Sequence, residues 1–239
     1  LFNKETNRRI KALVPMHTFG HAVELEELQV ICEKYHLILV EDAAESLGTY
    51  YKGKQTGSFG KVSAISFNGN KIMTTGGGGA ILTDDEALAD YAKHITTTAK
   101  VPHRWEFDHD EVAFNYRLPN INAALGCAQL EKMPEFIEQK RALTAFYEEL
   151  VAPLEGVTLF KEPANSFSNY WLQTLILDDT LVRDDVLAFL NDHGVMSRPI
   201  WTPLHKLKPY RDCPRADLST IERLNKKIIN IPSTPIKEG

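Results

Sequence analysis

The sequence predicts an α/β protein, with a mostly parallel sheet in a large first domain and a smaller α+β domain after it. Two short apolar runs, at 12–16 and 37–40, flank residues 23–36, where apolar side chains recur at three- and four-residue steps. A strand–helix–strand unit of this kind has parallel strands and a right-handed crossover. The run at 37–40 is apolar at consecutive positions, as in a strand that is covered on both faces. From Pro153 onward, short strand-like runs alternate with a helix predicted near 184–193, which indicates the second domain.

The elements that follow the first unit are predicted from turn residues and apolar runs. Residues 50–60 are polar and contain several glycines, which predicts a loop or a small hairpin. The apolar run at 62–67 predicts a buried strand, and the run at 80–82 predicts another. Asp84 or Asp85 can cap the helix that comes next, because a side-chain oxygen there accepts hydrogen bonds from the first turn.

The middle of the chain contains a long irregular stretch and then a helix. Residues 96–119 show no periodicity, and a stretch of this length is more often functional or interfacial than idle. Asn120 can cap the helix that follows. We expect Pro134 to break or kink this helix, because proline removes a backbone hydrogen bond and clashes with the preceding turn. The predicted domains are therefore 1–133 and 134–239, with the kinked helix as a connector.

Composition and charge exclude several classes of protein. The 239 residues are 43% apolar and 25% charged, as in a globular protein, and the formal net charge of -5 argues against nucleic acid or an anionic membrane as partner. No apolar run approaches the roughly 20 residues that span a bilayer, and the polar first residues do not resemble a signal peptide. The three cysteines are far apart and predict no disulfide framework. We therefore expect a cytoplasmic protein, and no spacing of ligand side chains predicts a metal site.

Polar side chains at the ends of two predicted strands suit the cofactor pyridoxal phosphate. Asp42 follows the run at 37–40, while Ser66, Asn68 and Lys71 lie at the end of the next strand and beyond it. Taken singly, each residue has a common structural explanation. Lys71 could be a solvated loop lysine, Asp42 could cap a turn, and Ser66 and Asn68 could make local hydrogen bonds at a strand end. Together they supply a lysine that forms a Schiff base, a carboxylate that keeps the ring nitrogen protonated, and donors for the phosphate.

Four ordered motifs resemble the sugar aminotransferases of the DegT/DnrJ/EryC1/StrS family. They are VEDAAESLG (40–48), GSFG (57–60), ISFNGNKIMTTGGGG (65–79) and FNYRLPNINAALGCAQLEK (114–132). The resemblance covers nearly the whole chain and implies a fold-type I pyridoxal-phosphate transferase. It also implies that Lys71 is the catalytic lysine, that Asp42 contacts the pyridine nitrogen, and that Ser66 holds the phosphate.

Further residues take roles from the same resemblance. Glu45 stands where the family usually has a glutamine near the phenolic oxygen of the cofactor. Asn115 corresponds to a residue that reaches across a dimer interface to the phosphate in the partner subunit, and Arg117 lies near the substrate side. Arg198 and His205, the latter within TPLH (202–205), correspond to a segment near the sugar nucleotide.

The activity implied by the resemblance is amination of a nucleotide-linked 4-keto sugar, with glutamate or another amino acid as donor, by a homodimer with shared active sites. Gly77, Glu45 and Leu47 depart from the common family pattern. Together with MHTFGH (16–21), this variant resembles the subgroup that makes 4-amino sugars for legionaminic-acid or bacillosamine-type cell-surface glycans.

Two alternatives stay open from the sequence. Family members have roughly a hundred further residues upstream, the size of a large part of a domain, so we expect an upstream part of the fold that this sequence lacks. A non-catalytic remnant that dimerises or binds nucleotide sugars is therefore one alternative. The other is a pyridoxal-phosphate-dependent sugar dehydratase, although related dehydratases of the family carry histidine at the position of Lys71.

Overall fold

The computed structural model describes residues 1–235 of the chain, which divides into two compact units. The first unit consists of Leu1, Arg9–Phe136 and Pro163–Asn169, and the second of Phe2–Arg8, Ile137–Glu162 and the chain from Tyr170 onward. Within residues 1–235, no helix has both the length and the apolar character needed to cross a bilayer.

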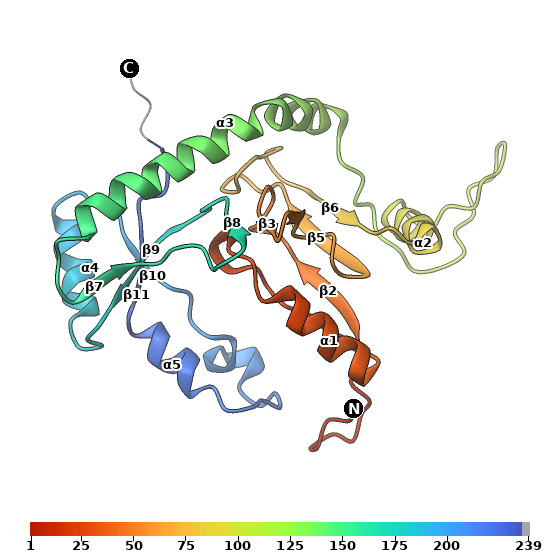
Figure 1. Ribbon diagram of the computed structural model, residues 1–239. Helices are drawn as coiled ribbons and strands as arrows, with labels where there is room; N and C mark the ends of the chain where they lie inside the picture. The colour runs from red at the N-terminus through yellow and green to blue at the C-terminus, as the bar shows by residue number, and fades with distance from the viewer. Residues whose placement is uncertain (236–239) are drawn as a thin grey trace. The chain divides into compact units, whose positions relative to one another are not determined.

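A four-stranded sheet forms the first unit's main layer (Figure 1). Its strands are β1 (Ala12–Leu13), β2 (Ile38–Asp42), β5 (Val62–Ser66) and β6 (Gly79–Leu82), in the spatial order β1-β2-β5-β6. The first three strands are parallel, and β6 is antiparallel to β5. The parallel pairing confirms the predicted strand–helix–strand unit. It also places the carboxyl ends of β2 and β5 at the same edge of the sheet.

Helix α1 (Leu25–Tyr35) connects β1 to β2 and packs against the latter. Leu25 and Cys32 lie two turns apart on the helix and are buried in one cluster with Leu39 and Tyr51. The helix ends at Tyr35, and the left-handed backbone of the next residue, His36, lets its N–H donate back to carbonyls of the last turn. The apolar face of α1 therefore supplies the core on this side of the sheet.

A small second sheet lies in the same unit. The hairpin predicted in 50–60 forms from β3 (Tyr50–Tyr51) and β4 (Lys54–Gln55). Strand β8 (Ser166–Phe167) pairs with β3 from far along the chain. The 3-10 helix η1 (Thr18–Gly20) follows β1.

Helix α2 (Glu86–Thr96) begins where the capping rule predicts. Asp85 accepts a hydrogen bond from Leu88 N at 3.0 Å. The following residues, 97–119, contain no named helix or strand, as expected. Phe114 N and Tyr116 N donate to carbonyls at the end of α2 at 2.8 Å each, so this stretch returns to the helix that it leaves.

Helix α3 (Asn120–Val151) is one helix of 32 residues with Pro134 inside it. The helix is therefore not broken at Pro134, while the alternative of a kink there stays a prediction. Proline removes one backbone hydrogen bond, which costs about 3 kcal/mol in a helix interior. Buried side chains beyond the proline, including Ile137 and Leu143, offset this cost, because burying one large apolar side chain contributes about 1.5–3 kcal/mol.

The second unit contains an antiparallel sheet with helices packed on it. The strands lie in the order β10 (Arg198–Pro199), β11 (Ile228–Ile231), β9 (Gln173–Leu177) and β7 (Val157–Leu159). Leu177, Ile229 and Ile231 form its core, with Tyr147 of α3 and Leu187 of α4 packed against them. The remaining elements are α4 (Arg183–Asp192), α5 (Ser219–Asn225), and the 3-10 helices η2 (Leu204–Lys206) and η3 (Lys208–Tyr210).

Candidate active site

Lys71 lies in the turn after β5, and its amine faces the carboxylate of Glu45. Lys71 N donates to Asn68 O at 3.1 Å, which closes the turn. Lys71 Nζ lies 3.7 Å from Glu45 Oε1, and only 13% and 9% of the two side chains are exposed. Opposite charges attract each other more strongly where water is largely excluded. The structure thus brings together two residues that the sequence predicts for the site.

The carboxylate of Glu45 is held from a second side by the backbone of η1. Phe19 N donates to Glu45 Oε2 at 2.8 Å. Burial raises the pKa of the Glu45 carboxyl, and the charge of Asp42 adds to the rise, whereas the Phe19 N–H and Lys71 oppose it. The net result is a raised pKa, so this carboxyl accepts a proton more readily than an exposed glutamate does.

Asp42 ends β2 at the edge of the sheet where ligands bind in open α/β proteins. Its Oδ1 accepts a hydrogen bond from Ala44 N at 3.2 Å. Asp42 pairs with Ala64 of the parallel strand β5, and Ser66 lies two residues further along that strand. Asp42 and Ser66 therefore lie at the carboxyl ends of neighbouring strands, as predicted, and the charge of Asp42 acts on Glu45.

Ser66 and Asn68 belong to the same turn as Lys71. Ser66 Oγ accepts a hydrogen bond from Asn68 N at 3.3 Å, and Asn68 Nδ2 donates to Asn70 Oδ1 at 3.1 Å. Ser66 is half-buried, whereas Asn68 is exposed. These bonds are local ones, of the kind that serine and asparagine make in many turns.

The loop that follows Lys71 is attached to helix α3. Asn122 Nδ2 donates to Thr75 O at 2.5 Å, and Gln129 Oε1 accepts from Thr74 N at 3.3 Å. Gly126 brings the helix close to this loop, because a Cβ at that position would lie 2.9 Å from Thr75 Cγ2. The motif that contains Lys71 and the motif at 114–132 are therefore connected by direct contacts.

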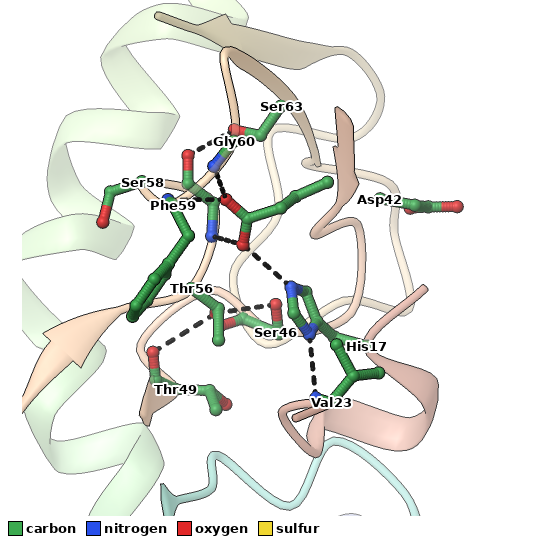
Figure 2. A network of polar contacts seen from close by, with 12 residues as sticks. His17, Val23, Asp42, Ser46, Thr49, Thr56, Ser58, Phe59, Gly60 and Ser63 are labelled. Atoms are coloured by element: carbon green, nitrogen blue, oxygen red, sulfur yellow. Dashed lines mark hydrogen bonds and ion pairs between the residues drawn. The ribbon is translucent and has the colours of Figure 1, made fainter. Parts of the chain in front are cut away.

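A buried carboxylate, Glu41, lies one residue before Asp42 and was not among the predicted site residues. Glu41 Oε1 accepts from the N–H groups of Phe59 and Gly60 at 2.6 Å each, and Oε2 accepts from Gly57 N at 2.8 Å. His17 Nε2 lies 3.0 Å from Oε2, and both side chains are fully buried. Figure 2 shows His17 facing this network and the side chain of Asp42 directed away from it.

The two ring nitrogens of His17 have different partners. Val23 N donates to His17 Nδ1 at 3.3 Å, which leaves Nε2 to donate to Glu41. Strand alternation sends neighbouring side chains to opposite faces, so Glu41 anchors the strand from one face and leaves Asp42 on the other. The pair Glu41-Asp42 in sequence is the only local signal of this arrangement.

A second unpredicted residue, Asn169, holds the turn that carries Glu45. Asn169 Nδ2 donates to Glu45 O and Leu47 O at 2.9 Å each, and Asn169 N donates to Thr49 Oγ1 at 3.0 Å. Asn169 is fully buried and lies more than a hundred residues after Glu45 in the sequence. No pattern near Asn169 in the sequence indicates this contact.

Asn115 and Arg117 lie in the exposed stretch between α2 and α3. Arg117 Nε donates to Asn115 Oδ1 at 3.0 Å. Arg117 lines a groove of about 820 Å³ between β5, β6 and α2, together with apolar residues such as Ile65, Ile81 and Leu118. None of the residues Asp42, Glu45 and Lys71 lines this groove.

Arg198 and His205 belong to the second unit. Arg198 lies on β10 and is exposed. His205 Nε2 lies 2.9 Å from Glu222 Oε1, which fixes the imidazole against α5. The same unit buries Tyr170 and Trp171, which therefore belong to its core.

One group of metal-ligand side chains occurs among residues 1–235. The ligand atoms of His94, Asp110 and Glu111 lie within 4.8 Å of one another. Hydrogen bonds account for this arrangement, because His94 Nε2 lies 2.6 Å from Asp110 Oδ1 and Tyr91 OH donates to Glu111 at 3.2 Å. The group therefore connects α2 to the stretch that follows it.

The family model described as the DegT/DnrJ/EryC1/StrS aminotransferase family matches residues 2–237. The chain belongs to this family. GDP-perosamine synthase of Vibrio cholerae is 34% identical to it over 235 residues, which are 97% of this chain and 64% of that enzyme. The protein EpsN of Bacillus subtilis is 42% identical over 195 residues, which are 82% of this chain and 50% of EpsN.

Among solved structures, Helicobacter pylori PseC is an aminotransferase involved in the biosynthesis of pseudoaminic acid. It superposes with a TM-score of 0.90 at 26% identity, covering 97% of this chain and 63% of PseC. This similarity confirms the predicted α/β, fold-type I class. The present chain spans half to about two thirds of the length of these relatives.

Proposed function

We propose that this chain provides the catalytic lysine of a pyridoxal-phosphate-dependent aminotransferase that converts a nucleotide-linked 4-keto sugar to the 4-amino sugar. The observation that carries the proposal is the largely buried Lys71 amine, 3.7 Å from Glu45, at the sheet edge where Asp42 ends β2. A lysine amine forms a Schiff base with a carbonyl compound once it has lost its proton. Membership of the family supports the same activity.

The residues at this edge fit pyridoxal phosphate by their chemistry. The cofactor needs an amine, a carboxylate and several hydrogen-bond donors, and Lys71, Asp42 and Ser66 supply these groups from two neighbouring strands and the turn after them. When bound, the cofactor supplies an electron-withdrawing ring that stabilises negative charge on a substrate carbon.

Each residue of this group has a definite task under the proposal. The Lys71 amine holds the cofactor and moves protons at its own Nζ. The Asp42 carboxylate keeps a proton on the ring nitrogen, because a neighbouring negative charge favours the protonated ring. Ser66 and Asn68 would contribute donors to the phosphate, and Glu45 would lie near the phenolic oxygen.

The substrates are proposed from the relatives and from the sequence motifs. The names of the relatives, GDP-perosamine synthase and PseC, an aminotransferase of pseudoaminic acid biosynthesis, support a nucleotide sugar as substrate. The motif MHTFGH (16–21) supports cell-surface glycan biosynthesis as the process. We propose glutamate as the amino donor. Arg117, Arg198 and His205 would contact the nucleotide sugar, since guanidinium groups bind phosphate oxygens well.

We further propose a cytoplasmic homodimer in which Asn115 reaches the phosphate of the cofactor in the partner subunit. The exposure of Asn115 and of its aromatic neighbour Tyr116, 71% exposed, supports an interface here.

A spectroscopic experiment tests the assignment of Lys71. Purified protein mixed with pyridoxal phosphate should develop the absorbance of the lysine-linked cofactor, and borohydride reduction should fix the added mass on Lys71. Lys71→Ala should abolish both signals, while Lys34→Ala, which removes an exposed lysine of α1, should leave them intact. Retention of both signals in Lys71→Ala would contradict the assignment.

A further inference from the structure

We propose that Glu45 is a second catalytic residue, which takes a proton from Lys71 Nζ and returns it when that amine bonds to a carbonyl compound. This inference deepens the proposed function, on which it rests, because it concerns how the same lysine becomes reactive. Three observations support the inference: the distance between the two side chains, the groups that surround Glu45, and a reaction step that balances.

The geometry places a single carboxylate oxygen at the amine. Oε1 of Glu45 lies 3.7 Å from Lys71 Nζ, and Oε2 accepts the hydrogen bond from Phe19 N at 2.8 Å. The two oxygens therefore have different tasks: one is held by the backbone and the other faces the amine. A small movement of the flexible lysine side chain brings Nζ within the 2.7–3.2 Å of an ordinary hydrogen bond.

The position of Glu45 is set by fixed backbone on both sides. Ser46 N donates to Ala43 O at 3.2 Å within the turn, and Asn169 Nδ2 donates to Glu45 O at 2.9 Å. Phe19, which holds Oε2, is itself buried and adopts a left-handed backbone with φ +59°. A side chain held in this way loses little conformational entropy when it reacts, and such fixed positioning favours catalysis.

The electrostatic surroundings favour proton exchange at this carboxyl. Burial raises the pKa of Glu45, the negative charge of Asp42 raises it further, and Lys71 with the Phe19 N–H opposes the rise. A carboxyl with a raised pKa is a stronger base than an exposed glutamate, and general bases work best when their pKa lies near the operating pH.

The proposed step conserves atoms and charge. The Lys71 Nζ–H bond breaks and an Oε1–H bond forms on Glu45, which leaves a neutral amine. The nitrogen lone pair then adds to the carbonyl carbon, and a second proton passes from Nζ to the carbonyl oxygen, which becomes a hydroxyl. Glu45 returns its proton to this hydroxyl, which leaves as water, and the carboxylate is regenerated.

The test uses formaldehyde, a carbonyl compound that needs no cofactor site. The full chain is treated with formaldehyde and cyanoborohydride, and methylation of Lys71 is followed by peptide mass spectrometry between pH 5 and pH 9. The other lysines of the chain serve as an internal reference. Glu45→Gln keeps an acceptor for Phe19 N but cannot take a proton. Glu33→Gln, an exposed glutamate of α1, is the matched control.

We expect Glu45→Gln to slow methylation of Lys71 at least tenfold, consistent with the factor of roughly 10² or more that general bases contribute. The wild-type rate should rise with pH as Glu45 loses its proton, and this limb of the profile should vanish in Glu45→Gln. Glu45→Asp should restore part of the rate and the pH-dependent limb.

The sign of the effect decides between two roles for the carboxylate. A carboxylate that only attracted the ammonium would hold the amine unreactive, so Glu45→Gln would then react as fast as the wild type or faster. Either result would overturn the inference. Circular dichroism of Glu45→Gln checks that the fold is retained, and Glu45→Asp provides a second variant if it is not.

Failure of this inference can be distinguished from failure of the proposed function. If Glu45→Gln slows methylation but the wild type shows no lysine-linked cofactor, the proton exchange stands and the cofactor assignment fails. If Lys71→Ala abolishes the cofactor signal while Glu45→Gln leaves methylation unchanged, the proposed function stands and the proton exchange fails.

Discussion

Replacing Glu41 by glutamine should destabilise the first unit strongly, although the two side chains have nearly the same shape. The carboxylate accepts hydrogen bonds from three backbone N–H groups and faces His17 Nε2 at 3.0 Å, and the Glu41 and His17 side chains are both fully buried. A glutamine oxygen placed at Oε1 still serves Phe59 and Gly60. Its amide nitrogen then faces Gly57 N and the imidazole, which are both donors.

The magnitude follows from these contacts. Each buried donor that loses its acceptor costs about 1–3 kcal/mol, and two donors lose theirs. We therefore expect Glu41→Gln to lower the free energy of unfolding by about 2–6 kcal/mol, out of the roughly 5–15 kcal/mol that domains possess.

The assay combines urea unfolding with amide hydrogen exchange. Exchange at Gly57, Phe59 and Gly60 should accelerate in Glu41→Gln, because their acceptor is altered. Glu33→Gln should leave both the unfolding free energy and the exchange rates unchanged. The reasoning is refuted if Glu41→Gln stays within about 1 kcal/mol of the wild type with unaltered exchange at these three amides.

The difference in unfolding free energy between the wild type and Glu41→Gln should depend on pH. Burial raises the pKa of Glu41, but the hydrogen bonds from His17, Gly57, Gly60 and Phe59 more than offset it, so the pKa is lowered. The charged form therefore stabilises the folded state above the unfolded pKa of about 4.3, and this stability is lost as the pH falls through the lower, folded pKa. The difference between wild type and Glu41→Gln should be full at pH 6 and shrink below about pH 4.

Two further predictions concern the glycine run and a buried lysine. Gly79→Ala should destabilise the chain by more than about 1 kcal/mol, because its Cβ would lie 2.3 Å from the carbonyl oxygen of Ile65. Gly77→Ala is the control: no atom lies within 4 Å of a Cβ at that position, so its thermal unfolding should match that of the wild type. A similar loss in both variants would contradict this reading. Burial lowers the pKa of Lys140 to about 8. The unfolded chain then binds one more proton than the folded chain between about pH 8 and 10.4, so stability should rise with pH in that window. Chemical unfolding at pH 8 and 10 should show this rise in the wild type and not in Lys140→Met; a parallel pH response would refute it.

The sequence could predict much of the fold because those features are local. Apolar periodicity predicted α1, a capping aspartate predicted α2, and consecutive apolar residues predicted β2 and β5, all of which the structure contains. Pro134 does not break α3, because helix propensity is a local term and tertiary packing on both sides of the proline outweighs it.

The candidate site was predictable only in part, because some of its contacts are local in the sequence and others depend on tertiary packing. Asp42, Ser66 and Lys71 follow strands, and their positions come from local pattern and motif. The approach of Glu45 to Lys71 depends on two segments 26 residues apart in the chain, which only the pairing of β2 with β5 brings together. Asn169, which holds the Glu45 turn, comes from far beyond α3.

By itself, then, the sequence determined the family, the order of the main strands and helices, and the lysine after β5. Only the tertiary structure decided which carboxylate meets that lysine and which one, Glu41, is buried as an anchor instead. Neighbouring residues on a strand face opposite sides, and long-range pairing determines what each side meets. The Lys71–Glu45 contact is a product of that pairing, and it is the contact from which the proposed chemistry starts.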